Sequence, residues 1–245
     1  FLIRIVLPAV CVFALFATVV FGVVVPRFHD SILMQKRAMI RELTAVAVSD
    51  IRHFAELARS GTLATQEAQK RAIEEVRAMR YGPERKDYFW ITDRAPIMLM
   101  HPYREDLVGK DLSDYRDTED PHGKRLFARF AELVRENGEG YLRYQWQWKD
   151  DPSRIVEKLS YVRGVPEWGW IVGTGIYLDD VEADMANLIG RLRALFGYTA
   201  LGLALLLAVL VWQGIRLETR RRQAETGLRE ARDRYRALVE AATEG

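Results

Sequence analysis

Two long uncharged stretches constrain the fold of this chain more than any other feature of its sequence. No charged residue occurs in the 21 residues from Ile5 to Val25, or in the 22 residues from Ala194 to Ile215. A helix needs about 20 consecutive apolar residues to cross the hydrocarbon core of a bilayer. We therefore expect two transmembrane helices, with the remainder of the chain divided between the two sides of a membrane.

The first stretch could instead be a secretory signal peptide. The apolar core of such a peptide runs to about 7–15 residues, and a cleavage site of the A-x-A kind follows it. Here the apolar run is longer and no such site follows. A retained span is therefore favoured. The sequence begins at Phe1 rather than at a methionine, so we expect the natural N-terminus to have been trimmed.

Basic residues beside the spans predict the orientation of the chain. Arg4 precedes the first span, and four arginines closely follow the second: Arg216, Arg220, Arg221 and Arg222. Both outer ends are expected in the cytoplasm, with residues 27–193 across the membrane, because long loops translocate largely regardless of charge. The only cysteine, Cys11, lies in the first span, so the outer part must rely on its core rather than on disulfides. The net charge of +2 gives no indication of a nucleic-acid partner.

Helical patterns flank the outer part and interrupt it once. Residues 27–60 lack proline and glycine, and their apolar stripe is broken only at Asp50. A second helix is expected over residues 66–79 with Thr65 as its cap, and a third after Asp120 and Pro121, ending before Gly138. The last helix is expected to run from Asp179 and Asp180, read as its cap, into the second span.

Five short segments show strand patterns rather than helical ones. They cover residues 87–92, 97–101, 141–148, 155–162 and 170–178. Most of the connections between them are tight turns rich in Asp, Pro and Gly. The expected fold class is therefore α+β, with a five-stranded antiparallel sheet, helices on one side of it and a long N-terminal helix.

Several motifs in the outer part occur together in one order. They are YFWI at 88–91, MLMHP at 98–102, KLSYV at 158–162 and WGWIVGTGIY at 168–177. With them, residues 27–184 resemble the bacterial single Cache domain of the second type, a PAS-like extracytoplasmic sensor domain. The resemblance implies a ligand pocket between sheet and helices, and a small organic acid as ligand. The third strand ends in WQWKDDP, whereas relatives often have a WPKP-like turn that borders the pocket.

The uncharged runs and the resemblance together predict four parts of the chain. Residues 1–26 form the first transmembrane helix, 27–184 the sensor domain, 185–215 the second transmembrane helix with its helical lead-in, and 216–245 a cytoplasmic coiled-coil linker. Leu217, Ala224, Ala231 and Leu238 lie seven apart, which favours a helix that dimerises. The last residues resemble the start of a cytoplasmic PAS domain. The predicted location is the bacterial inner membrane, with the sensor domain in the periplasm.

Full-length relatives of this layout are usually sensor histidine kinases or diguanylate cyclases, and a chemoreceptor is an alternative. No catalytic motif of either enzyme class occurs in this chain, so we expect a ligand-sensing, signalling fragment that forms a homodimer and acts through a cytoplasmic output domain. A membrane-anchored periplasmic enzyme is less favoured, because the sequence offers neither a nucleophile–base pair nor a metal cluster. Gly173-Thr174-Gly175 lacks the pattern of a phosphate loop.

Lys158 is the most informative polar residue of the outer part. Most lysines in strands turn their ammonium outward, and periodicity does not decide here, because apolar residues lie on both faces of the strand. If Lys158 faces the pocket, it would attract a carboxylate. His101 is as readily a structural residue as a ligand, although its imidazole can donate a hydrogen bond to a carboxylate. No metal or cofactor is expected.

Aromatic residues on the strands are candidates for the walls of a cavity. Tyr88 and Trp90 share one face of the first strand, and Tyr144, Trp146 and Trp148 share one face of the third. Some of them must be ordinary core, but buried Tyr and Trp need partners for their polar atoms. The full set of predicted ligand-binding residues is Tyr88, Trp90, Met100, His101, Arg104, Arg143, Tyr144, Trp146, Lys158 and Tyr161, with Arg104 or Arg143 as a second cation.

Overall fold

The structure is a computed structural model that describes residues 2–116 and 125–243. The chain divides into two compact units, one of residues 28–186 and one of residues 1–27 with 187–245. The predicted helix cap at Asp120 and Pro121 lies outside the described residues. The proposed boundaries at residues 26, 184 and 215 remain predictions.

The unit built from the two ends of the chain is helical. Helix α1 (Leu2–Val19) continues through a π-helical turn, η1 (Val20–Val24), into α2 (Val25–Arg59), and α5 (Leu178–Thr243) supplies the other helix. Both helices are long and apolar enough to cross a membrane, by length and composition. Within this unit the ring of Phe196 packs against three phenylalanine rings of the N-terminal segment, with centroids 5.0–5.9 Å apart: Phe13, Phe16 and Phe21.

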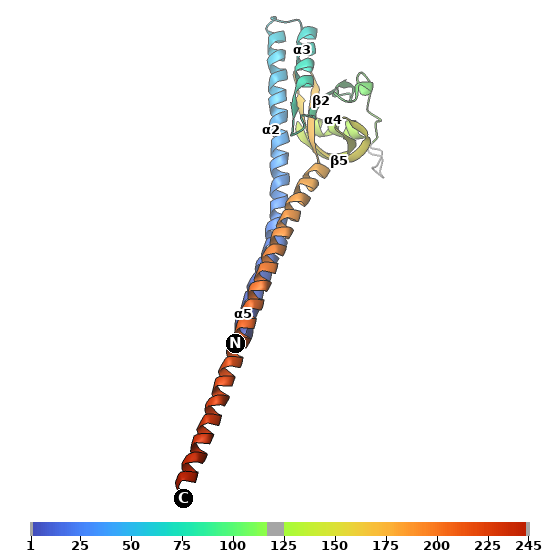
Figure 1. The fold of residues 1–245 in the computed structure, drawn as a ribbon. Coiled ribbons are helices and arrows are strands. Elements are labelled where there is room, and N and C mark those ends of the chain that lie inside the picture. The colour runs from blue at the N-terminus through green and yellow to red at the C-terminus, as the bar shows by residue number, and fades with distance from the viewer. Residues whose placement is uncertain (1, 117–124, 244–245) are drawn as a thin grey trace. The chain divides into compact units, whose positions relative to one another are not determined.

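The second unit contains an antiparallel sheet (Figure 1). Its strands are β1 (Arg80–Tyr81), β2 (Asp87–Asp93), β3 (Met98–Met100), β4 (Glu139–Trp148), β5 (Asp151–Val165) and β6 (Trp170–Tyr177). They run in the order β1-β2-β6-β5-β4, and β3 pairs with β2. The five predicted strands and the α+β class are confirmed. The two-residue β1 was not predicted, because so short a segment shows no periodicity.

The helices of this unit begin and end largely where the sequence indicates. They are the part of α2 from residue 28 onward, α3 (Thr65–Ala78), α4 (Leu126–Asn137) and the first turns of α5, with a short 3-10 helix η2 (Glu105–Leu107). Gly138 ends α4 in the left-handed conformation, with φ 77°, as predicted. The prediction for Thr65 was wrong: it is the first residue of α3, and Ala64 occupies the cap position without a side-chain bond.

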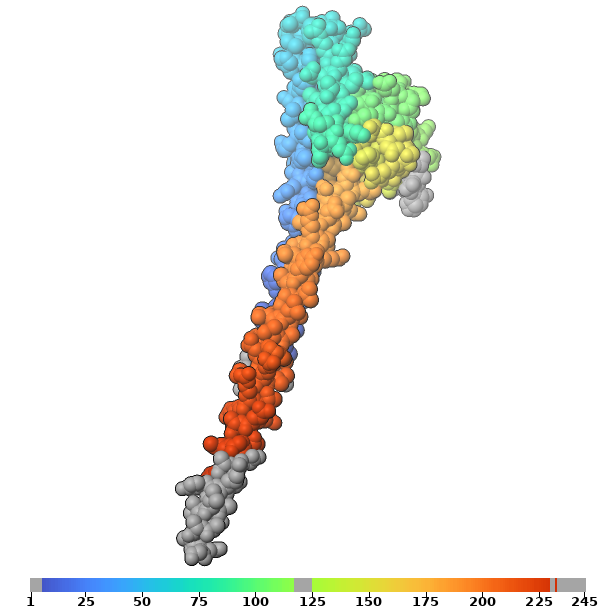
Figure 2. Space-filling view, in the orientation of Figure 1, coloured from blue at the N-terminus to red at the C-terminus, as the bar shows by residue number. Residues whose placement is uncertain are grey.

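The two faces of the sheet are both covered. Phe89 and Ile91 of β2 point toward α2 and α3, where they pack with residues such as Ile51. Tyr88 and Trp90 point the other way, into a cluster covered by α4 and the 101–116 segment. In the space-filling view the 101–116 segment and the residues around 145–160 lie on the side away from α2 (Figure 2). The expectation of helices on one side was wrong, because every residue of β6 is buried and both faces need a cover.

The start of α5 also differs from its prediction. The helix begins at Leu178, so Asp179 and Asp180 lie in its first turn rather than at its cap. Carboxylates there still interact favourably with the positive end of the helix dipole. Because Tyr177 is the last residue of β6, the sheet passes into α5 without a linker.

Candidate ligand site

Lys158 lies in the middle of β5 with its side chain on the sheet face away from α2 and α3. It shares that face with Val156 and Ser160, since alternate residues of a strand point the same way. In the register of the sheet it pairs with Tyr144 of β4 on one side and with Tyr177 of β6 on the other. Only 1% of Lys158 is exposed. The register therefore places a buried ammonium among aromatic rings.

The ammonium of Lys158 has weak partners. Its Nζ lies 4.0 Å from the centroid of the Tyr88 ring and 4.8 Å from that of Tyr177, and it donates to the Tyr177 hydroxyl at 3.4 Å. Within the described residues no carboxylate oxygen lies within ion-pair distance of it. Burial lowers the pKa of Lys158 to about 7, although the negative charge of Asp87 acts in the opposite direction. The site thus holds a cation whose charge has no strong local compensation.

Hydrogen-bonded aromatic side chains surround this ammonium. The indole Nε1 of Trp146 donates to the Tyr88 hydroxyl at 2.9 Å, and the hydroxyls of Tyr144 and Ser160 are 2.9 Å apart. Phe127 and Phe130 of α4 cover the cluster and make edge contacts with its rings. These bonds fix the ring orientations, so the wall is rigid.

His101 follows β3 and belongs to the same cluster. It is 1% exposed, and its ring lies 4.8 Å from that of Tyr88 and 5.8 Å from that of Trp146, between centroids. Its Nδ1 accepts a hydrogen bond from the backbone N–H of Tyr103 at 3.2 Å, which puts the proton of the neutral ring on Nε2. Burial, and next the charge of Lys158, hold the pKa of His101 well below its ordinary value. The Nε2 atom is buried and has no partner among the described residues.

The structure brings six of the ten predicted residues into one cluster. They come from β2, β4, β5 and the end of β3, and they are Tyr88, Trp90, His101, Tyr144, Trp146 and Lys158. Arg104 lies at the edge of this cluster, with its guanidinium carbon 5.9 Å from the centroid of the Trp146 ring. Both Nε and Nη2 of Arg104 are held by Asp106 at 2.8 Å.

The other three predicted residues lie elsewhere. Met100 is fully buried on the α2 and α3 side, and Met98 is the methionine that packs in the aromatic cluster. Tyr161 faces α2, beside Ile40. Arg143 is half exposed on that same face of the sheet and pairs with Glu157 at 3.9 Å. A ligand-binding role for these residues is a prediction that their positions do not favour.

Tyr177 was missed by the sequence reasoning. Tyr177 follows Gly173 and Gly175 at alternate positions of β6. The sequence therefore indicates that these three residues share one face of the strand. The spacing does not tell which residue of β5 stands opposite, and only the register identifies Lys158. Gly173 has a related role: a side chain there would collide with the indole of Trp90. The glycine thus allows the indole to approach the strand closely.

Among the described residues, two of the hollows near the surface of this unit bear on access to the cluster. A small one of about 80 Å³ is lined by Trp146, Arg104, Tyr115 and Ile155 among others. A wider one of about 790 Å³ lies beside α4 and is lined by Arg94, Arg125, Arg129 and Arg135, with Pro96. The wider hollow shares no lining residue with the Lys158 cluster, whereas the smaller one shares Trp146 with it. The described residues hold no group of three or more His, Cys, Asp or Glu that could bind a metal.

Residues 32–189 match the family described as single Cache domain 2. The chain belongs to the single Cache domain 2 family. This confirms the predicted family for the part of the chain that carries the Lys158 cluster.

The Cache domain also aligns with curated relatives. The chain is 36% identical over 203 residues to the methyl-accepting chemotaxis protein McpP of Pseudomonas putida, covering 82% of this chain and 36% of that protein. It is 32% identical over 168 residues to the sensor histidine kinase MctS of Rhizobium johnstonii, covering 68% of this chain and 34% of that protein. The chain therefore spans about a third of the length of these relatives.

Solved structures of similar fold are also sensor domains. A periplasmic sensor domain of a chemotaxis protein is 39% identical with a TM-score of 0.55, covering 59% of this chain and 96% of that domain. A second structure is 32% identical with a TM-score of 0.55, covering 61% of this chain and 97% of its own. That second structure is described as the basis for carboxylic acid recognition by a Cache chemosensory domain.

Proposed function

We propose that this chain is the ligand-sensing and membrane-spanning part of a bacterial receptor, and that it binds a small carboxylate beside Lys158. The observation that carries the proposal is the buried ammonium of Lys158, which has no carboxylate within ion-pair distance in the described part of the chain. Leaving a buried charge unpaired is costly, and a bound carboxylate would supply the missing counter-charge. The carboxylic acid recognition of one structural relative supports the same ligand class.

The chemistry of the cluster favours one carboxylate over two. Lys158 offers two free N–H donors and His101 offers its Nε2–H, so both oxygens of a single carboxylate can be satisfied. The remainder of the wall is aromatic, with Trp90 and Phe130 among its members. A second carboxylate would have to face these rings, because Arg104 is already held by Asp106. The expected ligands are therefore small monocarboxylates.

The finer location and the output of the receptor belong to the same proposal. Two helices long enough to span a membrane flank the Cache domain, which supports a place in the bacterial inner membrane with the domain in the periplasm. Relatives include both a chemoreceptor and a sensor histidine kinase. We infer a chain without enzymatic activity of its own that signals as a homodimer through a cytoplasmic output domain, with a diguanylate cyclase as the other candidate output and a periplasmic enzyme as the least favoured reading.

Calorimetry on the full chain in lipid nanodiscs tests the proposal. The probes are acetate and propionate, with succinate as a dicarboxylate and acetamide as an uncharged control. We expect saturable binding of a monocarboxylate and none of acetamide. Lys158→Met keeps the length of the side chain and removes its charge, so it should weaken binding at least about tenfold, the effect of losing one charged hydrogen bond.

A matched control is available on the neighbouring loop. The side chain of Lys86 is 40% exposed, and its ammonium pairs with Asp150 at 2.8 Å and not with a member of the aromatic cluster. Lys86→Met removes the same charge from the same domain and should leave the affinity unchanged. Absence of saturable binding of any of the acids, or full affinity in Lys158→Met, would remove the proposed function.

A further inference from the structure

Lys149 occupies an unusual place in the turn between β4 and β5. Its φ of +47° lies in the left-handed region, which glycine and asparagine adopt readily and lysine rarely does. Its side chain is nevertheless 5% exposed, whereas a lysine in a turn normally extends into water. A strained backbone that carries a buried cation needs contacts that stabilise it, and such outliers gather at functional positions.

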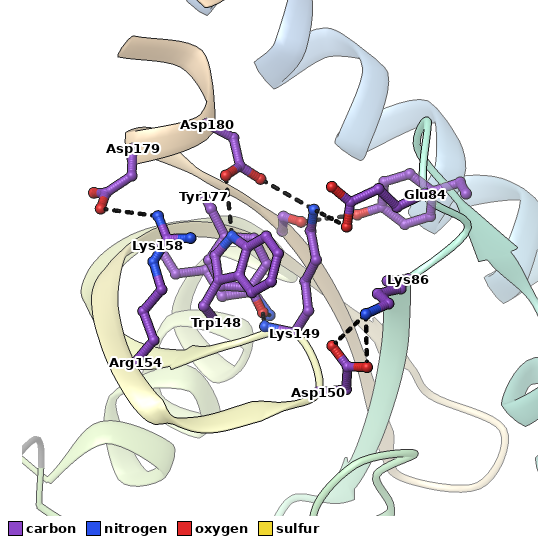
Figure 3. A network of polar contacts seen from close by, with 12 residues as sticks. Glu84, Lys86, Trp148, Lys149, Asp150, Arg154, Lys158, Tyr177, Asp179 and Asp180 are labelled. Atoms are coloured by element: carbon purple, nitrogen blue, oxygen red, sulfur yellow. Dashed lines mark hydrogen bonds and ion pairs between the residues drawn. The ribbon is translucent and has the colours of Figure 1, made fainter. Parts of the chain in front are cut away.

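The contacts of Lys149 join three parts of the domain (Figure 3). Its Nζ lies 3.3 Å from a carboxylate oxygen of Glu84, in the loop between β1 and β2, and 3.3 Å from one of Asp180, in the first turn of α5. It also lies 4.3 Å from the centroid of the Trp148 ring. Asp180 in turn accepts a hydrogen bond from Nε1 of Trp148 at 3.0 Å. Lys149 and its neighbour Trp148 are thereby fastened to the start of α5 through an ion pair and a hydrogen bond to one carboxylate.

The same turn is linked to the candidate ligand site through one atom. The hydroxyl of Tyr177 accepts a hydrogen bond from the backbone N–H of Lys149 at 2.8 Å and one from Nζ of Lys158 at 3.4 Å. Tyr177 is the residue directly before α5. A change at the Lys158 ammonium therefore reaches Tyr177, just before α5, through one hydrogen bond, and the backbone of Lys149 through a second. All of these residues belong to the unit of residues 28–186.

We propose that Lys149 is a positioning residue that couples occupancy of the Lys158 site to the first turn of α5. This inference rests on the proposed function. A carboxylate bound at Lys158 draws the ammonium away from the Tyr177 hydroxyl, whose oxygen then loses one of the two hydrogen bonds that it accepts. The hydrogen bond from the backbone N–H of Lys149 to the same oxygen is altered as a result. The ion pair between Lys149 and Asp180 is altered with it. The ligand can shift this arrangement only because it binds the two states with different affinity.

Neighbouring ion pairs show what a purely structural role would look like. Lys86 pairs with Asp150 in the same turn, and Arg154 of β5 pairs with Asp179 of α5 at 3.7 Å, but each of these side chains is 40–45% exposed. Such pairs contribute little and are screened by salt. Lys149 differs from them because it is buried and because its backbone reaches the ligand site. Lys86→Met is therefore the matched control for a variant of Lys149.

The experiment is hydrogen exchange of residues 178–186 in the full chain, in nanodiscs, with and without saturating acetate or propionate, whichever binds. In the natural chain we expect the exchange rate of this segment to depend on the acid. In Lys149→Met that dependence should be lost while calorimetry shows the acid still bound. Lys86→Met should keep both. Lys149→Asn is a second variant that removes the cation but tolerates the left-handed turn, so it distinguishes loss of coupling from loss of folding.

The outcomes separate this inference from the proposed function. If the natural chain binds none of the acids, the proposed function fails before the coupling is tested. If it binds an acid but exchange in 178–186 does not respond, or if Lys149→Asn responds as fully as Lys86→Met, Lys149 does not couple the site to α5. In either of the latter cases carboxylate binding at Lys158 still stands.

Discussion

Lys158 of β5 and Tyr177 of β6 stand directly opposite each other in the sheet, and the ammonium of the lysine lies 3.4 Å from the hydroxyl of the tyrosine. The faces of the Tyr88 and Tyr177 rings also lie against that ammonium, and they attract a cation but carry no full charge. The protonation of Lys158 is therefore sensitive to any anion that arrives, and two predictions follow from its pKa of about 7.

The first prediction concerns proton uptake on binding. At pH 8 much of the free lysine is neutral, and a carboxylate against Nζ favours the charged form, so binding should take up to about one proton from solution. The affinity should fall by about tenfold for each pH unit above 7. Calorimetry at pH 8 in two buffers of different ionisation enthalpy measures the uptake. Equal heats in the two buffers, with a Kd that is constant from pH 6 to pH 9, would contradict it.

The second prediction concerns stability without ligand. The pKa of Lys158 is lowered in the folded chain from an ordinary value of 10.5, so between about pH 7 and pH 10 the unfolded chain binds more protons than the folded one. The free energy of unfolding should therefore rise with pH in this window, by at most about 1.4 kcal/mol per unit from this residue. Thermal unfolding followed by tryptophan fluorescence suits the measurement, since five of the six tryptophans lie in the 28–186 unit.

The matched variant for that measurement is Lys158→Met. Because it has no buried charge, it should be more stable than the natural chain at pH 7. It should also lack the rise between pH 7 and pH 9. A variant with the same pH dependence as the natural chain would show that another group causes it.

The elements of the sheet and the helices could be predicted from the sequence because they depend on local pattern. Alternation in 87–92 and in 141–148 correctly separates Tyr88 and Trp90 from Phe89, and places Tyr144 with Trp146. Alternation fails where the ladder is irregular. A register shift lies between Gln147 and Trp148, and Trp148 donates to Asp180 and is not part of the cluster. A second shift, between Ile91 and Thr92, lies where β2 pairs with β3, the strand of Met98 and Met100.

The residues of the candidate site could not be predicted from the sequence of any single strand. Whether Lys158 faces the aromatic cluster or α2 depends on which strands stand beside β5 and in what register. The ion pairs of Lys149 depend on three segments that are far apart in the chain, so neither its burial nor its partners can be read from the turn sequence. The family resemblance supplied the general position of a pocket but not the residues that line it.

The third prediction concerns His101. In the free chain its ring should be neutral at pH 7 and should titrate well below its ordinary value of 6.5, because burial and the charge of Lys158 lower its pKa. Selective ¹⁵N-histidine labelling should show the tautomer with the proton on Nε2, assigned by its loss in His101→Phe. Saturation with the bound acid should shift the Nε2–H resonance. A titration midpoint near 6.5, or a resonance unmoved by the acid, would argue against a donor role.

The fourth prediction uses the two predicted site residues that face α2. Tyr161→Phe and Arg143→Gln should each leave the Kd for the acid within about twofold, since such distant changes add almost nothing to the site. Tyr88→Phe removes a hydroxyl that accepts from Trp146 inside the cluster and should weaken binding measurably. Calorimetry on the three variants compares them directly. A large loss in Arg143→Gln with none in Tyr88→Phe would place the ligand on the opposite face of the sheet.

The fifth prediction concerns Gly173, which stands opposite Trp90 in the sheet. The indole lies across this glycine, and it cannot withdraw, because the rings of Phe127 and Phe130 lie 5.7 and 5.0 Å from it between centroids. Gly173→Ala should therefore reduce the free energy of unfolding by about 1–3 kcal/mol, the usual effect of overpacking a buried site. Thermal unfolding followed by tryptophan fluorescence measures the loss.

Two further variants decide whether the collision is the cause. Gly190 in α5 has no atom within 4 Å of the position that a side chain would take, so Gly190→Ala should cause no loss. In the Gly173→Ala background, Trp90→Leu should cost less than it does in the natural chain, because the smaller side chain removes the clash. If the two changes simply add, the indole is not what requires glycine at position 173, and the wall that we assign to Trp90 is less rigid than its contacts indicate.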